Sequence, residues 1–153
     1  MPPHVAFFSW TVVLGKILTI DSLRKRGLII VDWCYMCTQS GESVDHLLLH
    51  CRLAGELWSM VFALFGVQLV MLRSVLELFT FAGWDRCSVA WWIVPHCVIW
   101  CIWRERNARH FEVSKRTILE LKLFFLQNLY EWVEALGLFP IHFFVELIDI
   151  CTF

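Results

Sequence analysis

The residue pattern that most constrains this chain is a set of three cysteines and one histidine in its first third. Cys34, Cys37, His46 and Cys51 follow the spacing C-x2-C-x8-H-x4-C. Two thiols this close can lie on one tight turn and point at one ion, and the next two residues can complete a tetrahedron. Thiolate sulfur and imidazole nitrogen suit zinc. The pattern therefore predicts a zinc site, with ordinary buried cysteines as the alternative.

The spacing leaves the fourth ligand open. His46 and His50 are four residues apart and share one face of a regular helix, whereas Cys51 is turned partly away. Either His50 takes the fourth position, which the spacing slightly favours, or the helix loosens so that Cys51 reaches the ion. Four protein ligands leave no open position for water, which predicts a structural zinc. Asp45 is a candidate for orienting the His46 ring.

The composition indicates a folded and unusually apolar chain. Hydrophobic residues make up 59% of the 153 residues, with nine Trp and thirteen Phe, and the mean hydropathy is +0.64. This indicates either a large core or an apolar face for a partner. A net charge of −1 gives no overall attraction to nucleic acid. Seven cysteines without a secretory leader favour a reducing intracellular compartment, the nucleus or the cytoplasm.

Two uncharged runs, residues 57–72 and 87–103, are the candidates for a membrane span. Both are shorter than the roughly 20 residues that a spanning helix needs. Gln68 interrupts the first run, and Pro95 and His96 interrupt the second. We therefore expect buried helices and consider a membrane partner unlikely on this ground.

Helical periodicity and helix-end signals predict a mainly α fold of five or six helices around a Trp and Phe core. A first helix carries Phe7, Trp10, Val13 and Leu14 and ends near Gly15. A second, capped by Thr19 or Asp21, runs to residue 26 and is closed by Gly27. The β-branched residues of 28–31 predict a short strand.

Four further helices are expected after the CxxC turn. Ser43 can cap a long helix from His46 to about residue 65, so that the metal would hold its start. A short helix around residues 75–79 and an aromatic one over about 88–112 follow. Thr117 and Glu120 form a capping box that opens a last helix to about residue 136.

Two basic sets are candidates for contact with nucleic acid. Arg24, Lys25 and Arg26 end the second predicted helix, where the helix dipole alone also favours cations. The second set consists of Arg104, Arg106 and Arg109. It lies beside Trp103 and Phe111, so cations and rings can form a stacking surface. The alternative is a solvated helix face whose arginine stems cover aromatic rings.

These residues together resemble a known family. The matching residues are Pro3 to Trp10, Leu18-Thr19, Leu23 to Gly27, Cys34, Cys37, Glu42, His46 to Leu48, Cys51, Ala54 and Trp58. They are similar to the zinc-binding domain that follows the reverse transcriptase of plant non-LTR (LINE-type) retrotransposons. Residues 102–112 are similar to a segment common downstream of that domain.

The resemblance implies Cys34, Cys37, His46 and Cys51 as the ligands of a structural Zn²⁺. It implies a zinc-stabilised helical domain over residues 2–65, in which a long helix after the CxxC turn carries the other ligands. Additional apolar helices over residues 66–153 would form a C-terminal extension packed on it. It also implies an ancestral role in reverse transcription, holding template RNA or target DNA.

The chain lacks the catalytic motifs that a complete retrotransposon polyprotein would carry, which limits the function that we expect. The chain contains no YxDD-type polymerase motif and no cluster of carboxylates for an RNase H-like site. No Ser/His/Asp arrangement and no phosphate-binding glycine loop stands out. We therefore expect a non-enzymatic zinc module with weak affinity for RNA or DNA and no small-molecule substrate. The alternative is a structural or protein-interaction remnant that packs on the reverse transcriptase polypeptide and binds no nucleic acid.

Overall fold

The structure is a computed structural model that describes residues 1–64, 72–80, 93–112 and 114–137. Its elements are α1 (Pro3–Val13), α2 (Ile20–Lys25), the π-helix η1 (His46–His50), α3 (Arg52–Leu64), α4 (Val75–Thr80), α5 (Ile93–Asn107), the π-helix η3 (Ala108–Glu112) and α6 (Ile118–Ala135). The described residues contain helices and no strand, which confirms the mainly α prediction.

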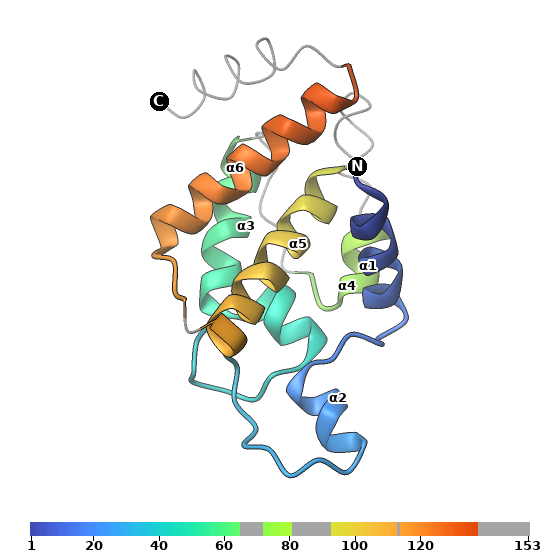
Figure 1. Cartoon of the computed structure of the whole chain (residues 1–153), viewed down its shortest axis with the longest axis vertical. Helices are drawn as coiled ribbons and strands as arrows, with labels where there is room; N and C mark the ends of the chain where they lie inside the picture. Colours follow the sequence, from blue (N-terminus) through green and yellow to red (C-terminus); the bar gives the residue numbers. More distant parts are fainter. Residues whose placement is uncertain (65–71, 81–92, 113, 138–153) are drawn as a thin grey trace.

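The helix α5 lies at the centre of the molecule (Figure 1). It contacts α1 on one side and α3 and α6 on the other, and it also touches η1. Its fully buried apolar side chains are those of Ile93, Val94, Cys97, Val98, Ile99, Cys101 and Ile102. One hydrophobic cluster joins these residues to α1, to the CxxC turn, to α3 and to α6. The segments before and after residue 65 therefore share a core.

The first predicted helix is present as α1, but a different face of it is buried. Phe7 and Trp10 are 65% and 60% exposed, whereas Val5, Phe8 and Val12 are buried. Nearly every position of this helix is apolar, so the sequence pattern does not fix which face turns inward. The exposed rings leave an apolar strip on the surface of α1.

The short second helix is confirmed as α2, with Thr19 at its N-cap and Gly27 beyond its end at φ +90°. The strand predicted over residues 28–31 is wrong. This segment is irregular, and the side chains of Ile29 and Val31 are fully and 75% exposed. A strand needs a neighbour for its backbone N–H and C=O groups, and no described segment pairs with this one.

The long helix predicted from His46 is interrupted near its start. The Ser43 hydroxyl accepts a hydrogen bond from the His46 N–H at 3.1 Å, as a cap should. His46–His50 form the π-helix η1, and the Cys51 N–H donates to the His46 carbonyl at 2.6 Å. Cys51 then takes an extended ψ of 141° before α3 begins at Arg52. One wide turn thus replaces the first turn of a regular helix.

The helices of the C-terminal half follow the sequence more closely. The Thr117 Oγ1 accepts from the Glu120 N–H at 3.2 Å, and the Glu120 carboxylate accepts from the Thr117 N–H at 2.7 Å, which confirms the capping box. Leu121, Phe125 and Leu129 of α6 are buried. The aromatic helix predicted over 88–112 appears as α5 and η3, and its residues 88–92 lie outside the described residues.

No helix in the described part of the chain combines the length and the apolar character that crossing a membrane requires. The first uncharged run contributes to α3, and the second to α5. Both helices bury their apolar residues in the shared core.

Candidate metal centre

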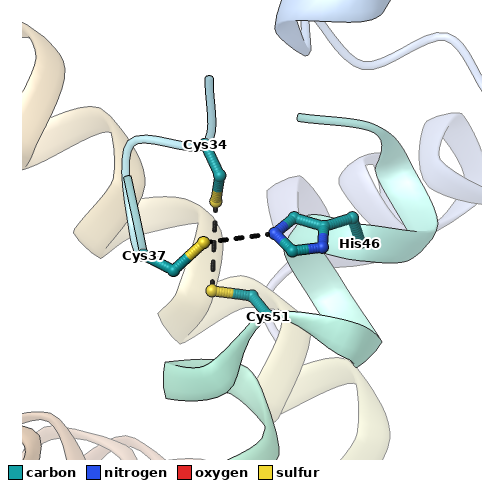
Figure 2. A group of neighbouring side chains, drawn as sticks. All are labelled: Cys34, Cys37, His46 and Cys51. Carbon is teal, nitrogen blue, oxygen red and sulfur yellow. Dashed lines mark hydrogen bonds between the residues drawn. The ribbon is translucent and has the colours of Figure 1, made fainter. Parts of the chain in front are cut away.

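Four side chains from two neighbouring segments converge at one point (Figure 2). Cys34 and Cys37 come from the CxxC turn, His46 from the start of η1, and Cys51 from the residue that separates η1 from α3. Their ligand atoms all lie within 4.8 Å of one another. The Cys34 and Cys51 sulfurs are 3.9 Å apart, and the Cys37 sulfur is 3.4 Å from the His46 Nε2.

These distances fit a tetrahedral zinc ion. With Zn–S bonds of about 2.3 Å and Zn–N bonds of about 2.0 Å, two sulfurs are separated by about 3.8 Å and a sulfur from a nitrogen by about 3.5 Å. The two observed separations, 3.9 Å and 3.4 Å, lie close to these values. Three sulfurs and one imidazole nitrogen form a donor set that is typical of structural zinc.

The CxxC turn is closed by its own backbone. The Cys34 N–H donates to the Ser40 carbonyl at 2.7 Å, and the Thr38 N–H donates to the Cys34 carbonyl at 2.8 Å. The Met36 N–H also points at the Cys34 sulfur, at 3.4 Å. A backbone N–H aimed at sulfur favours the thiolate, which is the form that binds a metal. Thr38 completes the turn at φ +56°.

The π-helix explains how Cys51 reaches the cluster. In a regular helix, residues four apart share a face, so His50 would lie on the same face as His46 and next to the cluster. The wider turn of η1 instead makes a five-residue hydrogen bond, from Cys51 back to His46. Cys51 joins the cluster, while the His50 Nε2 lies 3.1 Å from the Arg73 carbonyl. The structure thus brings together the four residues that the family resemblance implied.

The oxygen beside the His46 ring belongs to Ser40. Its hydroxyl lies 3.1 Å from Nε2 and 3.4 Å from Nδ1. Asp45, the residue that we expected to orient the ring, instead accepts a hydrogen bond from the Val75 N–H at 2.9 Å. Asp45 therefore holds the start of α4 against the metal segment.

The pKa values of Cys34, His46 and Cys51 are shifted by burial and by contact between charged groups. The hydrogen bond from the Cys34 thiol to Cys51 raises the pKa of Cys34 and lowers the pKa of Cys51. Burial lowers the pKa of His46, and the charge of His50 adds to this effect. The His46 imidazole is thus kept neutral, which is the form that can bind a metal.

A buried ion pair ties the loop of the cluster to α5. The Arg106 Nη2 lies 2.7 Å from the Glu42 Oε1, and the two side chains are 3% and 0% exposed. Glu42 also accepts from the backbone N–H groups of Ile20 at 3.1 Å and of Tyr35 at 3.2 Å. Its carboxylate therefore joins α2, the CxxC turn and α5 in one network.

A second arginine, Arg109 of η3, contacts the CxxC turn directly. The Arg109 Nη1 donates to the carbonyl of Met36, between the two cysteines, at 2.8 Å. Its Nε lies 2.9 Å from the Glu105 Oε1, and Glu105 also holds Arg116 at 2.9 Å. The role of Glu42 was not predictable from the sequence, because its partner Arg106 lies 64 residues away. Glu105 could have been found, because it lies four residues before Arg109, the spacing at which side chains of one helix form ion pairs.

The two predicted basic sets differ in their surroundings. Arg24, Lys25 and Arg26 are exposed; Arg24 lies 3.5 Å from Asp32, and the Lys25 side chain is 80% exposed. In the second set only Arg104 is exposed, with its guanidinium 5.9 Å from the Trp100 ring. Arg106 and Arg109 are instead held in the ion pairs described above, which corrects the expectation of a solvated or nucleic-acid-facing helix surface at these two positions.

Comparison with known families agrees with this geometry. Residues 1–58 match the family model described as zinc-binding in reverse transcriptase. The matched segment contains all four residues of the cluster and ends within α3. The match supports a reverse-transcriptase zinc-binding domain in this part of the chain. No curated protein and no solved structure matches the chain.

Proposed function

We propose that this protein is a non-enzymatic module built around a structural zinc ion. The observation that carries the proposal is the convergence of Cys34, Cys37, His46 and Cys51, whose ligand atoms lie within 4.8 Å of one another. Four protein ligands fill a tetrahedral zinc, so no position remains for water or substrate. When bound, zinc would supply a cross-link between the CxxC turn and the start of α3. The absence of a YxDD-type motif from the sequence supports the non-enzymatic assignment.

We infer from the sequence resemblance that the module descends from a plant LINE-type retrotransposon. The family match to zinc-binding in reverse transcriptase supports the reverse-transcriptase part of this inference. We also propose a reducing compartment, the nucleus or the cytoplasm, in which the cysteines of the metal centre would stay reduced.

Binding of RNA or DNA is part of the proposed function. It is supported by exposed cations close to the metal segment, at Arg24, Lys25 and Arg26. The second candidate is a protein-interaction module that packs on the reverse transcriptase polypeptide. The exposed Phe7 and Trp10 side chains on α1 favour that candidate, because large rings at 65% and 60% exposure suit a protein partner.

The metal assignment is tested by the zinc content of the purified full chain, measured by elemental mass spectrometry. We expect a single bound zinc in the wild type, lost in Cys34→Ala and Cys51→Ala and kept in His50→Ala. Loss in His50→Ala together with retention in Cys51→Ala would move the fourth ligand to His50. A folded wild-type protein without zinc would overturn the proposed function.

A further inference from the structure

A groove of about 800 Å³ lies beside the CxxC turn. Its walls come from the turn itself, from the first turns of α3 and from the segment that leads into α6. The aromatic and cationic side chains that line it are Trp33, Tyr35, Arg52, Arg109, Lys115 and Arg116. The groove thus combines ring faces and positive charge next to the metal centre.

The positive charge of the groove is not balanced within its walls. Arg109 and Arg116 are paired with the buried Glu105. Arg52 and Lys115 are exposed, and their side chains make no hydrogen bond or ion pair with any residue that the structure describes. The one lining acid, Glu56, lies 3.6 Å from the Lys122 ammonium. Two cations therefore remain available to an anionic ligand.

The aromatic part of the groove is held in place from behind. The Trp33 ring is 43% exposed and meets Tyr35 edge-on, with ring centroids 6.3 Å apart. Tyr35 is fixed in turn by the guanidinium of Arg106, 5.2 Å from its ring, and by His110 at 4.2 Å. Trp33 thus offers an accessible ring that is supported by the half-buried Tyr35.

We propose that this groove binds single-stranded nucleic acid, with a base stacking on Trp33 and phosphates contacting Arg52 and Lys115. This inference rests on the proposed nucleic-acid function and places it in the groove, not at the basic cluster of Arg24, Lys25 and Arg26. A cationic groove lined by aromatic rings suits unpaired bases, because every base has a face that can stack. The bases of a duplex are already stacked on each other, so a duplex would use only the cations.

The test is the binding of a fluorescent oligothymidylate and a fluorescent oligouridylate to the zinc-loaded full chain, followed by anisotropy. Arg52→Gln/Lys115→Gln is compared with the matched control Lys16→Gln/Arg73→Gln, which removes the same charge from exposed positions outside the groove and outside both basic sets. Lys25→Gln/Arg26→Gln is measured as well, to test the basic cluster of α2 as the alternative binding site. We expect the groove variant to bind at least about tenfold more weakly. Its salt dependence should fall by about 1.4 in log–log slope, the value for two lost phosphate contacts on a single strand. The matched control should stay within about threefold of wild type.

A second pair of variants tests the stacking. Trp33→Ala should weaken binding between roughly fivefold and a hundredfold, and Trp33→Phe should recover most of it, because a phenyl ring can still stack. Zinc content and circular dichroism serve as folding controls for each variant.

Three results would overturn the proposal, and they differ in what else they overturn. If the wild type binds neither oligonucleotide, both the groove and the nucleic-acid function are lost. If binding falls in Lys25→Gln/Arg26→Gln but not in the groove variants, only the groove assignment is lost. If the groove variants lose binding of polyglutamate while the wild type ignores both oligonucleotides, the groove takes an acidic peptide.

Discussion

At the scale of single residues, the most demanding feature is the buried pair of Arg106 and Glu42. Taking two charges out of water is costly, and their attraction compensates only when the remaining hydrogen-bonding groups are also satisfied. Here Glu42 receives two backbone N–H groups as well, and Arg106 donates to the Leu18 carbonyl at 3.3 Å. The Arg106 guanidinium is also 5.1 Å from the Trp103 ring. The pair is therefore a fully satisfied junction between the metal loop and α5.

Replacing Arg106 should be strongly destabilising. Arg106→Met leaves the Glu42 carboxylate buried without its partner, and we expect a loss of about 3–5 kcal/mol in the free energy of unfolding. Urea denaturation of the zinc-loaded protein measures this loss. Arg104→Met is the matched control on the same helix, and because Arg104 is exposed its cost should stay within about 0.5 kcal/mol. Equal costs for the two variants would contradict the structural role of the pair.

At the scale of elements, how well the sequence predicts a helix depends on how local its signals are. The capping box of Thr117 and Glu120 lies within one turn, and it predicted the start of α6 correctly. Two features depended on contacts that the sequence does not reveal. The buried face of α1 is set by packing against α5. The break at Cys51 follows a π-helix, for which helical periodicity gives no signal.

The candidate site was likewise predictable only in part. The residue spacing predicted Cys34, Cys37 and His46 as ligands of one ion but slightly favoured His50 as the fourth residue. The family resemblance supplied Cys51, which the wide turn of η1 then places in the cluster. The pair of Arg106 with Glu42 and the contact of Arg109 with the Met36 carbonyl could not be predicted, because these partners lie 64 and 73 residues away in sequence.

The contact of α5 with α1 and α4 predicts an acid sensitivity. The His96 Nδ1 of α5 lies 2.7 Å from the Ser9 hydroxyl of α1, and its ring is 4.9 Å from the Phe79 ring of α4. Burial lowers the pKa of His96 from 6.5 to about 4. At a pH between about 4 and 6.5, the unfolded chain binds a proton at His96, whereas the folded protein keeps this ring neutral. The stabilisation is therefore complete above about pH 6.5 and is lost as the pH falls toward 4.

We expect the contribution of His96 to fall by at most about 2 kcal/mol between neutral pH and pH 5. The measurement is the free energy of unfolding of wild type and His96→Gln across this range. Protonation of the metal ligands destabilises both proteins alike, so the difference between their slopes isolates His96. Parallel slopes would show that the pKa of His96 is not depressed in the folded protein.

At the scale of the whole molecule, the metal centre and the C-terminal helices form one structure. The family match ends at residue 58, yet Arg106 and Arg109 of the following half hold the loop that carries the first two cysteines. The core likewise draws on α1, α3, α5 and α6 together. The division into a domain of residues 2–65 and an extension of 66–153 stays a prediction, but the two segments share both polar and apolar contacts.

A fragment that ends at residue 65 should therefore bind zinc more weakly than the full chain. It keeps the four residues of the cluster but loses the Arg106 and Arg109 contacts, and the apolar faces of α1 and α3 are left without α5. Because zinc binding and folding are coupled, we expect an affinity at least about tenfold lower in competition with a chromogenic chelator. Equal affinities would show that the metal segment folds without the helices that follow it.

The hydrogen bond from Arg109 to the Met36 carbonyl also has a consequence for synthesis. The four residues of the metal cluster leave the ribosome well before α5, so the CxxC turn first forms without the arginines that later hold it. Contacts between residues so far apart form late, because the intervening chain must first be brought together. More than one-third of the protein is therefore synthesised between the last residue of the cluster and Arg109. Zinc bound in that interval would protect the thiols of the CxxC turn from oxidation.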